Sequence, residues 1–365
     1  MLFYDVTAFE SERGEGNLRV DGVLLDAPSP PAGMAAAIVS RLRIMAELDI
    51  AERRLPQDGR IRLAVSGRQL DVRVSTLPSL HGESVVLRLL GSATARLGID
   101  ELGMPADIRD QFLSAASRSH GIVLVTGPTG SGKTTTLYAA LDHIRSGTEK
   151  ILTVEDPVEY ELPGAVQVSI KPRIGLTFAS ALRALLRQDP DVMLVGEIRD
   201  LETAEIAIHA ALTGHLVLST LHTNDAAGAL TRLVDLGVEP YLVASTVQAV
   251  LAQRLVRLTC AECGRWTAPS ESEVSWAEAN GTRLERVKRG AGCTECRGTG
   301  YRGRTGAYAL LSMSDHARTQ FGHGAPAMAI RDQAVRAGMR LLKDAAVEFV
   351  RKGLTTPHEI ARVTG

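Results

Sequence analysis

The segment Gly127–Thr134, with the sequence GPTGSGKT, constrains the fold of this chain more than any other feature. It fits the pattern G-x-x-x-x-G-K-[ST] and lies between the apolar stretch Ile122–Val125 and a helical pattern that starts at Lys133. The glycines of such a loop let backbone N–H groups curl around phosphate oxygens, and the helix N-terminus adds partial positive charge. The alternative is a plain glycine-rich turn beside a surface lysine, and the flanking strand and helix argue against it. We therefore predict a phosphate-binding loop for ATP.

Two side chains of this loop have distinct predicted roles. Lys133 reaches the β- and γ-phosphates, and the hydroxyl of Thr134 ligates Mg²⁺. The predicted nucleotide-binding residues are Gly127, Pro128, Thr129, Gly130, Ser131, Gly132, Lys133, Thr134 and Thr135.

The rest of the chain fits two domains, as expected for 365 residues. Short β-type runs around one helical stretch at 34–48 predict a small α+β domain, whereas apolar strands alternate with helical patterns beyond Asp107. That alternation predicts an α/β fold with a mostly parallel sheet covered on both faces. The predicted boundaries are 1–95 for the first domain, 96–106 for a linker and 107–365 for the P-loop domain, which includes a tetracysteine subdomain at 255–306 and C-terminal helices at 327–365.

Three acidic residues follow a predicted strand within five positions, namely Glu155, Asp156 and Glu159. A carboxylate that follows a buried strand beside a phosphate loop is well placed to orient water or a metal ion. The alternative is that these acids cap a helix or lie in solvated turns. Their density next to the phosphate loop favours a functional role.

A second acid follows a strand of four apolar residues, which lead directly into Gly196 and Glu197. This form is typical of a Walker B strand, whose terminal acid supports Mg²⁺ and its water. A buried ion pair between Glu197 and Arg199 is the alternative. The presence of the phosphate loop favours metal support.

His215 and His222 flank the strand Leu216–Leu221. Their spacing of seven places them on opposite faces of an extended strand, so we expect them near its two ends in different roles. A lone histidine is more often structural. A histidine at the C-terminal end of a central strand, where α/β sheets bind their ligands, is a candidate contact for the γ-phosphate.

The chain has four cysteines in two C-x-x-C pairs, Cys260 with Cys263 and Cys293 with Cys296, and 29 residues separate the pairs. In a cytosolic chain this arrangement indicates a metal site rather than disulfides. Four thiolates in a tetrahedron suit Zn²⁺ and leave no open position, so we predict a structural zinc. Four incidental thiols are the alternative. The polar run Ser270–Thr282 is expected to loop out between the pairs.

The net charge and the hydropathy of the chain limit which partners it can bind and where in the cell it is expected. The formal net charge is −1, without the basic surplus of a nucleic-acid binder, so no nucleic acid is expected. No apolar run approaches the roughly 20 residues that a membrane span needs. The segment Met1–Gly16 is acidic and lacks the order of a signal peptide. We therefore expect a cytoplasmic protein whose membrane contact comes through partners.

Four segments resemble the Walker A, Asp box, Walker B and His box of the secretion ATPases, the superfamily that powers type II secretion and type IV pili. These segments are Gly127–Thr134, Ile151–Tyr160, Arg187–Asp200 and Gly214–Thr223. The resemblance covers most of the chain, and its further segments are 43–62, 76–90, 299–306 and 353–356. It implies a RecA-like P-loop core, a smaller PAS-like N-terminal domain and a zinc-binding insertion.

The resemblance also assigns roles to single residues. It implies that Glu159 activates the attacking water and that Glu197 is the Walker B acid for Mg²⁺, with His215 and His222 as the His-box pair. It further implies a homohexamer in which domain motion turns ATP hydrolysis into mechanical work.

Arg73 and Arg88 match arginines of the family's N-terminal domain that reach the nucleotide within the hexamer. Such arginines would spread transition-state charge. The alternative is that both make surface or interface salt bridges, which are common in proteins.

The cysteine module appears in type II secretion and pilus-extension ATPases and is lacking in retraction ATPases. We therefore expect an ATPase that powers pseudopilus assembly and protein export together with inner-membrane secretion platform proteins. A pilus-extension or competence ATPase, a non-hydrolysing nucleotide-binding scaffold and a DNA-translocating ATPase are the alternatives. Family members usually begin with a further domain that docks on a membrane-bound partner, and this sequence opens within what resembles the second domain.

Overall fold

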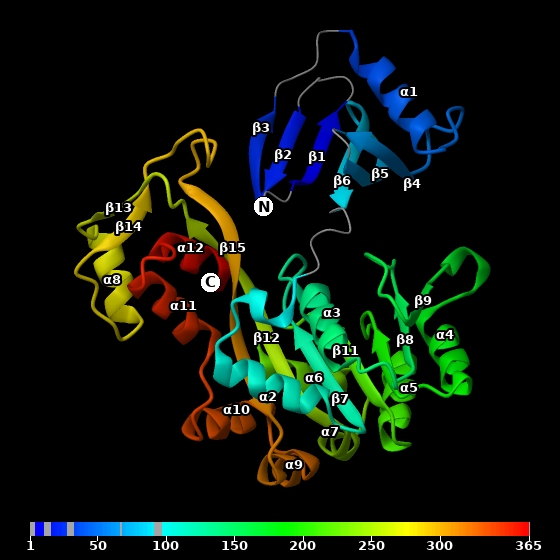
Figure 1. Cartoon of the computed structure of the whole chain (residues 1–365), viewed down its shortest axis with the longest axis vertical. Helices are drawn as coiled ribbons and strands as arrows, with labels where there is room; N and C mark the ends of the chain where they lie inside the picture. The colour runs from blue at the N-terminus through cyan, green and yellow to red at the C-terminus, as the bar shows by residue number, and fades with distance from the viewer. Residues whose placement is uncertain (1–3, 11–15, 28–32, 66–67, 91–96, 365) are drawn as a thin grey trace. The chain divides into compact units, whose positions relative to one another are not determined.

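The computed structural model describes residues 4–10, 16–27, 33–65, 68–90 and 97–364. The chain divides into two compact units, Met1–Ala95 and Arg96–Gly365 (Figure 1). The predicted linker 96–106 therefore falls within the second unit.

The first unit is a six-stranded antiparallel sheet with one described helix, α1 (Ala35–Met45). Val39 of α1 packs with Val72 and Val74 of the sheet in a small core. This packing buries one face of the sheet, as the alternating apolar pattern requires. In spatial order the strands are β3 (Val23–Ala27), β2 (Gly16–Val20), β1 (Tyr4–Glu10), β6 (Gly82–Leu90), β5 (Arg68–Ser79) and β4 (Gln57–Val65).

The second unit contains a seven-stranded sheet that is parallel except for its edge strand β15. Its central strands are fully buried and rich in Val, Ile and Leu, because helices cover both faces of a parallel sheet. In spatial order the strands are β15 (Tyr301–Ser312), β12 (Val247–Thr259), β7 (Gly121–Thr126), β11 (Leu216–Leu221), β10 (Val192–Val195), β8 (Ile151–Glu155) and β9 (Ala165–Ser169).

Helices form a layer on each face of this sheet (Figure 1). One face carries η1 (Ile99–Leu102), α2 (Ala106–Ala116) and α3 (Lys133–Ile144). The other carries α4 (Phe178–Leu185), α5 (Leu201–Leu212), α6 (Ala226–Asp235), α7 (Pro240–Thr246), α9 (Asp315–Gly322) and α10 (Ala327–Arg336). Two short 3₁₀ turns, η2 (Pro172–Ile174) and η3 (Leu186–Gln188), flank α4.

The segment predicted as a linker contributes to this core. Ile99, Leu102 and Met104 are buried with residues of α2 and α3. The hydroxyl of Tyr308 donates a hydrogen bond of 2.9 Å to the carbonyl of Leu102. The segment therefore packs into the core of the second unit. Its glycine-rich composition led us to predict a linker instead.

The cysteine-containing region forms a small layer of its own with the last two helices. One apolar cluster joins β14 (Val287–Gly290), α8 (Glu271–Ala279), α11 (Leu342–Arg351) and α12 (Pro357–Thr364), and β13 (Gly264–Thr267) pairs with β14. The run 270–282, which we predicted to loop out between the cysteine pairs, contains α8, and this helix starts with a capping box of Ser270 and Glu273. Among the described residues, no helix is long and apolar enough to cross a membrane.

Candidate active site

The phosphate loop lies at the C-terminal edge of the sheet, directly after β7. The strand ends at Thr126, and α3 begins at Lys133. β7 lies between β11 and β12, so the loop is surrounded by the ends of central strands. This edge is where open α/β sheets bind ligands.

Two glycines of the loop have conformations and surroundings that exclude a side chain. Gly127 has φ +154°, and a Cβ there would lie 2.5 Å from the carbonyl oxygen of Gln253. Gly132 has φ +87°, and its Cβ would lie 2.8 Å from the side-chain nitrogen of Gln253. The loop is therefore held closely against β12, and its backbone is free to curl around an anion.

The loop contains a buried cation and a buried hydroxyl suited to a phosphate. Lys133 is 8% exposed, and its Nζ donates to the carbonyls of Gly127 at 2.8 Å and Pro128 at 3.1 Å. Burial lowers the pKa of Lys133 to about 8, against the opposing effect of the Glu197 charge. The Oγ of Ser131 is buried and has no hydrogen-bond partner within the part of the chain that the structure describes. Both features fit a site completed by an anionic ligand.

Glu197 and His222 meet near the loop at the ends of neighbouring strands. Glu197 follows β10, and its carboxylate lies 2.5 Å from Arg199 and 3.5 Å from Nε2 of His222. Burial and the charge of Lys133 lower the pKa of His222. Glu197 thus contacts two exposed side chains, Arg199 and His222, and does not form a fully buried ion pair with Arg199 alone.

Thr134 and Thr135, which we predicted as nucleotide contacts, lie in the first turn of α3 and are half-buried. Pro128, Thr129 and Gly130 form the exposed rim of the loop. The sequence therefore locates the whole loop, and the structure adds which parts of it face solvent.

The acids after β8 divide into two environments. Glu155 is 3% exposed and accepts hydrogen bonds from Tyr138, from Thr153 at 2.5 Å and from Gln167 at 3.3 Å. Glu159 is half-buried in the irregular segment between β8 and β9. The first acid is therefore a structural anchor, and the second remains accessible.

His215 does not lie at the phosphate loop. It precedes β11, which runs parallel to β7 with Leu216 opposite Gly121. Its Nδ1 lies 3.0 Å from the carbonyl of Ala210 near the end of α5. The prediction that His215 acts on the nucleotide is not supported by this placement, because the length of β11 separates it from His222 and from the loop.

Arg73 and Arg88 belong to the first unit. They are cross-strand neighbours on β5 and β6, where Arg73 is half-buried and Arg88 is exposed.

Several residues that shape the site were not predicted from the sequence. Gln253 of β12 accepts a hydrogen bond of 2.7 Å from Thr136 of α3. Arg254 is 9% exposed, donates to the carbonyl of Asn224 at 2.9 Å and lowers the pKa of Lys133. No carboxylate among the described residues pairs with Arg254 at ion-pair distance. In the sequence, the adjacent polar residues Gln253 and Arg254 within the largely apolar stretch 247–259 could have indicated a functional role for this strand.

A pair of threonines also connects the loop's strand with β11. The hydroxyls of Thr126 and Thr223 lie 2.6 Å apart, and the Thr223 N–H donates to Thr126 at 3.0 Å. This contact fixes the segment that carries His222 beside the start of the phosphate loop. Nothing in the spacing of the two residues predicted it, because 97 positions separate them.

The four cysteines form one cluster, with ligand atoms all within 4.8 Å of one another. The sulfurs of Cys260 and Cys293 are 3.9 Å apart, those of Cys263 and Cys296 are 3.7 Å apart, and those of Cys293 and Cys296 are 3.6 Å apart. A tetrahedral zinc with Zn–S bonds of about 2.3 Å places its sulfurs about 3.8 Å apart. The cluster therefore fits a four-coordinate metal.

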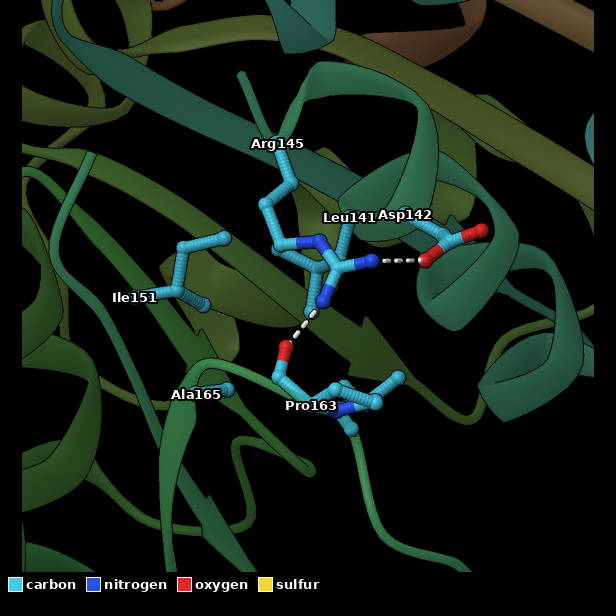
Figure 2. A pocket seen from close by; sticks show the side chains of 7 residues that line it. Leu141, Asp142, Arg145, Ile151, Pro163 and Ala165 are labelled. Atoms are coloured by element: carbon cyan, nitrogen blue, oxygen red, sulfur yellow. Dashed lines mark hydrogen bonds and ion pairs between the residues drawn. The ribbon is translucent and has the colours of Figure 1, made fainter. Parts of the chain in front are cut away.

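A shallow pocket lies at the other edge of the sheet (Figure 2). It is lined by Ile151 and Ala165, the first residues of β8 and β9, and by Arg145 after the end of α3. Figure 2 shows Arg145 between Asp142 and the carbonyl of Pro163. Because these residues are at the N-terminal ends of the strands, the pocket is separate from the phosphate loop.

A buried parallel sheet with a phosphate loop after the central strand β7, and an acid after β10, one strand further along the sheet than β11, defines the class of P-loop ATPases. Residues 8–362 match the family described as type II/IV secretion system protein. The chain belongs to this family.

Similar proteins agree with this assignment. The chain is 53% identical over 346 residues to the type II secretion system protein HxcR of Pseudomonas aeruginosa and 49% identical over 346 residues to the type II secretion system ATPase E of Vibrio cholerae. These matches cover 95% of this chain and 70% and 69% of those proteins. The structure of the ATPase DotB from Legionella pneumophila has the same fold, with a TM-score of 0.74, 21% identity and coverage of 99% of this chain and 91% of that one.

Proposed function

We propose that this chain hydrolyses ATP as one subunit of a homohexameric motor, and that the motor powers pseudopilus assembly and protein export in type II secretion. The observation that carries the proposal is the convergence of Lys133, Glu197 and His222 on a phosphate loop that is held against β12. The family of the chain and the names of its relatives support type II secretion as the process that the motor powers.

The residues divide the chemistry between them. Lys133 binds the β- and γ-phosphates, and Glu159 accepts the proton of the water that attacks the γ-phosphorus, so that ADP and phosphate are the products. Thr134 and Glu197 hold Mg²⁺, which neutralises charge on the phosphates when bound. His222 lies beside Glu197 and contacts the γ-phosphate. Arg73 and Arg88 of a neighbouring subunit complete the site.

The tetracysteine subdomain holds a structural Zn²⁺, and the protein acts on the cytoplasmic side of the inner membrane through secretion platform proteins. The distances between the cysteine sulfurs, which fit a tetrahedral zinc site, support this proposal.

The test of hydrolysis is steady-state ATP turnover of the wild type and of Glu159→Gln. The substitution keeps the size of the side chain and removes the base, so turnover falls by about 100-fold or more, whereas affinity for a non-hydrolysable analogue changes little. Glu205→Gln, at an exposed position of α5, is the control and retains turnover. Full turnover by Glu159→Gln would remove the proposed base.

Of the three alternative functions, a pilus-extension or competence motor stays open, whereas a non-hydrolysing scaffold and a DNA translocase are disfavoured. A pilus-extension or competence motor shares the same site and cysteine module, and complementation of a secretion-deficient strain distinguishes it from the proposed motor. A non-hydrolysing scaffold would show no turnover in a correctly assembled wild type. A DNA translocase would bind DNA in a salt-sensitive manner, for which the net charge of −1 gives no support.

A further inference from the structure

Tyr138 connects the phosphate-loop helix with the segment that carries Glu159. It lies on α3, one turn after Thr134, and its side chain is 1% exposed. A tyrosine this deeply buried needs partners for its hydroxyl, because an unsatisfied buried hydroxyl is costly.

The first partner of the hydroxyl is Glu155. Tyr138 donates a short hydrogen bond to one carboxylate oxygen, and Thr153 and Gln167 donate to the other. Burial raises the pKa of Glu155, and these three hydrogen bonds act in the opposite direction. Glu155 therefore fixes the direction in which the Tyr138 hydroxyl points its proton.

The hydroxyl oxygen also lies 3.5 Å from Nε2 of Gln167, which donates to the carbonyl of Tyr160 at 3.2 Å. The backbone N–H of Glu159 acts on the same hydroxyl by lowering the pKa of Tyr138, against the larger effect of burial. Since the hydroxyl proton is directed at Glu155, the oxygen faces the N–H donors of Gln167 and of this segment as an acceptor. The ring of Tyr138 also packs edge-on against Tyr160, with centroids 4.4 Å apart and an interplanar angle of 82°. Tyr138 thus contacts Tyr160, the residue after Glu159, directly through its ring and indirectly from its hydroxyl through Gln167.

The position of Glu159 depends on such contacts, because it lies outside regular secondary structure. The carboxylate of a general base must be held within hydrogen-bond reach of the attacking water. The helix α3 starts directly after the phosphate loop. A residue one turn along α3 therefore has a fixed position relative to the loop and can fix the position of Glu159 relative to it.

We infer that Tyr138 is a positioning residue that sets the place of Glu159 relative to the phosphate loop. The inference rests on the proposed function, since it takes Glu159 as the base. Glu155 acts in the same chain of contacts by holding the Tyr138 hydroxyl and does not touch the reacting atoms.

The test is the kinetics of Tyr138→Phe with Thr153→Val as the matched control. Tyr138→Phe keeps the ring and removes the link to Glu159, so kcat falls about 10- to 100-fold, while KM for ATP and analogue affinity stay within about twofold. Thr153→Val removes a hydrogen bond to the same buried carboxylate and leaves Glu159 untouched. It loses thermal stability to a similar degree and keeps kcat.

An unchanged kcat in Tyr138→Phe overturns the inference, and so does an equal loss of kcat in both variants, which would indicate a purely structural role. If Tyr138→Phe does not fold, amide hydrogen exchange of the wild type decides. The Glu159 amide is protected according to the inference, and fast exchange overturns it. Glu159→Gln is assayed alongside: turnover by Glu159→Gln removes the proposed base, whereas an inactive Glu159→Gln with a fully active Tyr138→Phe removes only the role of Tyr138.

Discussion

At the scale of single residues, the main feature is a lysine whose charge is disfavoured until a ligand arrives. Burial lowers the pKa of Lys133 to about 8, and the charge of Arg254 adds to this effect. The charge of Glu197 raises the pKa of Lys133, and the charge of Asp225 raises the pKa of Arg254, but burial outweighs both effects. The phosphates of ATP supply the opposite charge, so binding raises the pKa of Lys133 and relieves an unfavourable state.

This lowered pKa predicts a pH dependence of nucleotide affinity. Below about pH 7, Lys133 is charged in both states and affinity is constant. Above about pH 8, binding must take up a proton, so affinity falls by up to about tenfold per pH unit. Isothermal titration with a non-hydrolysable analogue in buffers of different ionisation enthalpy measures the uptake. Lys133→Arg removes this dependence, because a guanidinium stays charged. A wild-type affinity that is flat to pH 9.5 would contradict the account.

The same shift affects the nucleotide-free protein. The folded-state pKa of about 8 lies below the ordinary lysine value of 10.5, so the unfolded chain binds more protons between these values. Lys133 therefore destabilises the fold below about pH 8, and this cost is relieved as pH rises from 8 towards 10.5.

At the scale of elements, β12 connects three parts of the second unit. Gln253 and Arg254 contact the phosphate loop and the segment after β11. Three residues on, Arg257 pairs with Glu359 of α12 at 2.8 Å, and Cys260 follows the end of the strand. One continuous strand therefore joins the nucleotide site to the C-terminal helix and the cysteine cluster.

The ion pair on β12 predicts a stability effect. Glu359 is fully buried and also accepts from Arg362 at 2.6 Å. Glu359→Gln leaves a buried arginine without its counter-charge and costs about 3–5 kcal/mol, measured by urea unfolding. Glu348→Gln removes an exposed pair with Lys352 and costs less than about 1 kcal/mol. Equal effects of the two substitutions would contradict this assignment.

The buried carboxyl also predicts how this contribution depends on pH. Burial raises the pKa of Glu359, but hydrogen bonds from Arg362 and Arg257 outweigh it, and the pKa is lowered overall. Its contribution to stability is therefore present above the ordinary value of 4.5 and is lost as pH falls through the folded-state value.

At the scale of the whole molecule, the sequence predicted what depends on local pattern. The phosphate loop is marked by residue types at fixed spacing, and the apolar strands by their composition. The contacts of Tyr138 with Glu155 and of Thr126 with Thr223 join residues 17 and 97 positions apart, so no local pattern contains them. The sequence also predicted that His215 and His222 lie near opposite ends of one strand, and β11 separates them in this way.

The cysteine cluster predicts a metal-dependent part of the molecule. Removal of the metal with a strong chelator, or Cys260→Ser, is expected to lower bound zinc from one ion per chain to near zero, measured by elemental analysis. Amide exchange should then increase in β13, β14 and α8, because the cluster holds the ends of this region together. Cluster-bound iron in place of zinc, or unchanged exchange after its removal, would contradict the assignment.

ATP turnover per chain, measured across concentrations at which light scattering gives the assembly mass, shows directly whether this protein works as an ATP-driven ring. The account predicts that turnover appears together with a particle of six times the 39.0 kDa chain mass. It also predicts that the same particle made of Glu159→Gln is inactive. Constant turnover per chain down to the mass of a monomer, or a six-chain particle of the wild type without turnover, would contradict an ATP-driven ring.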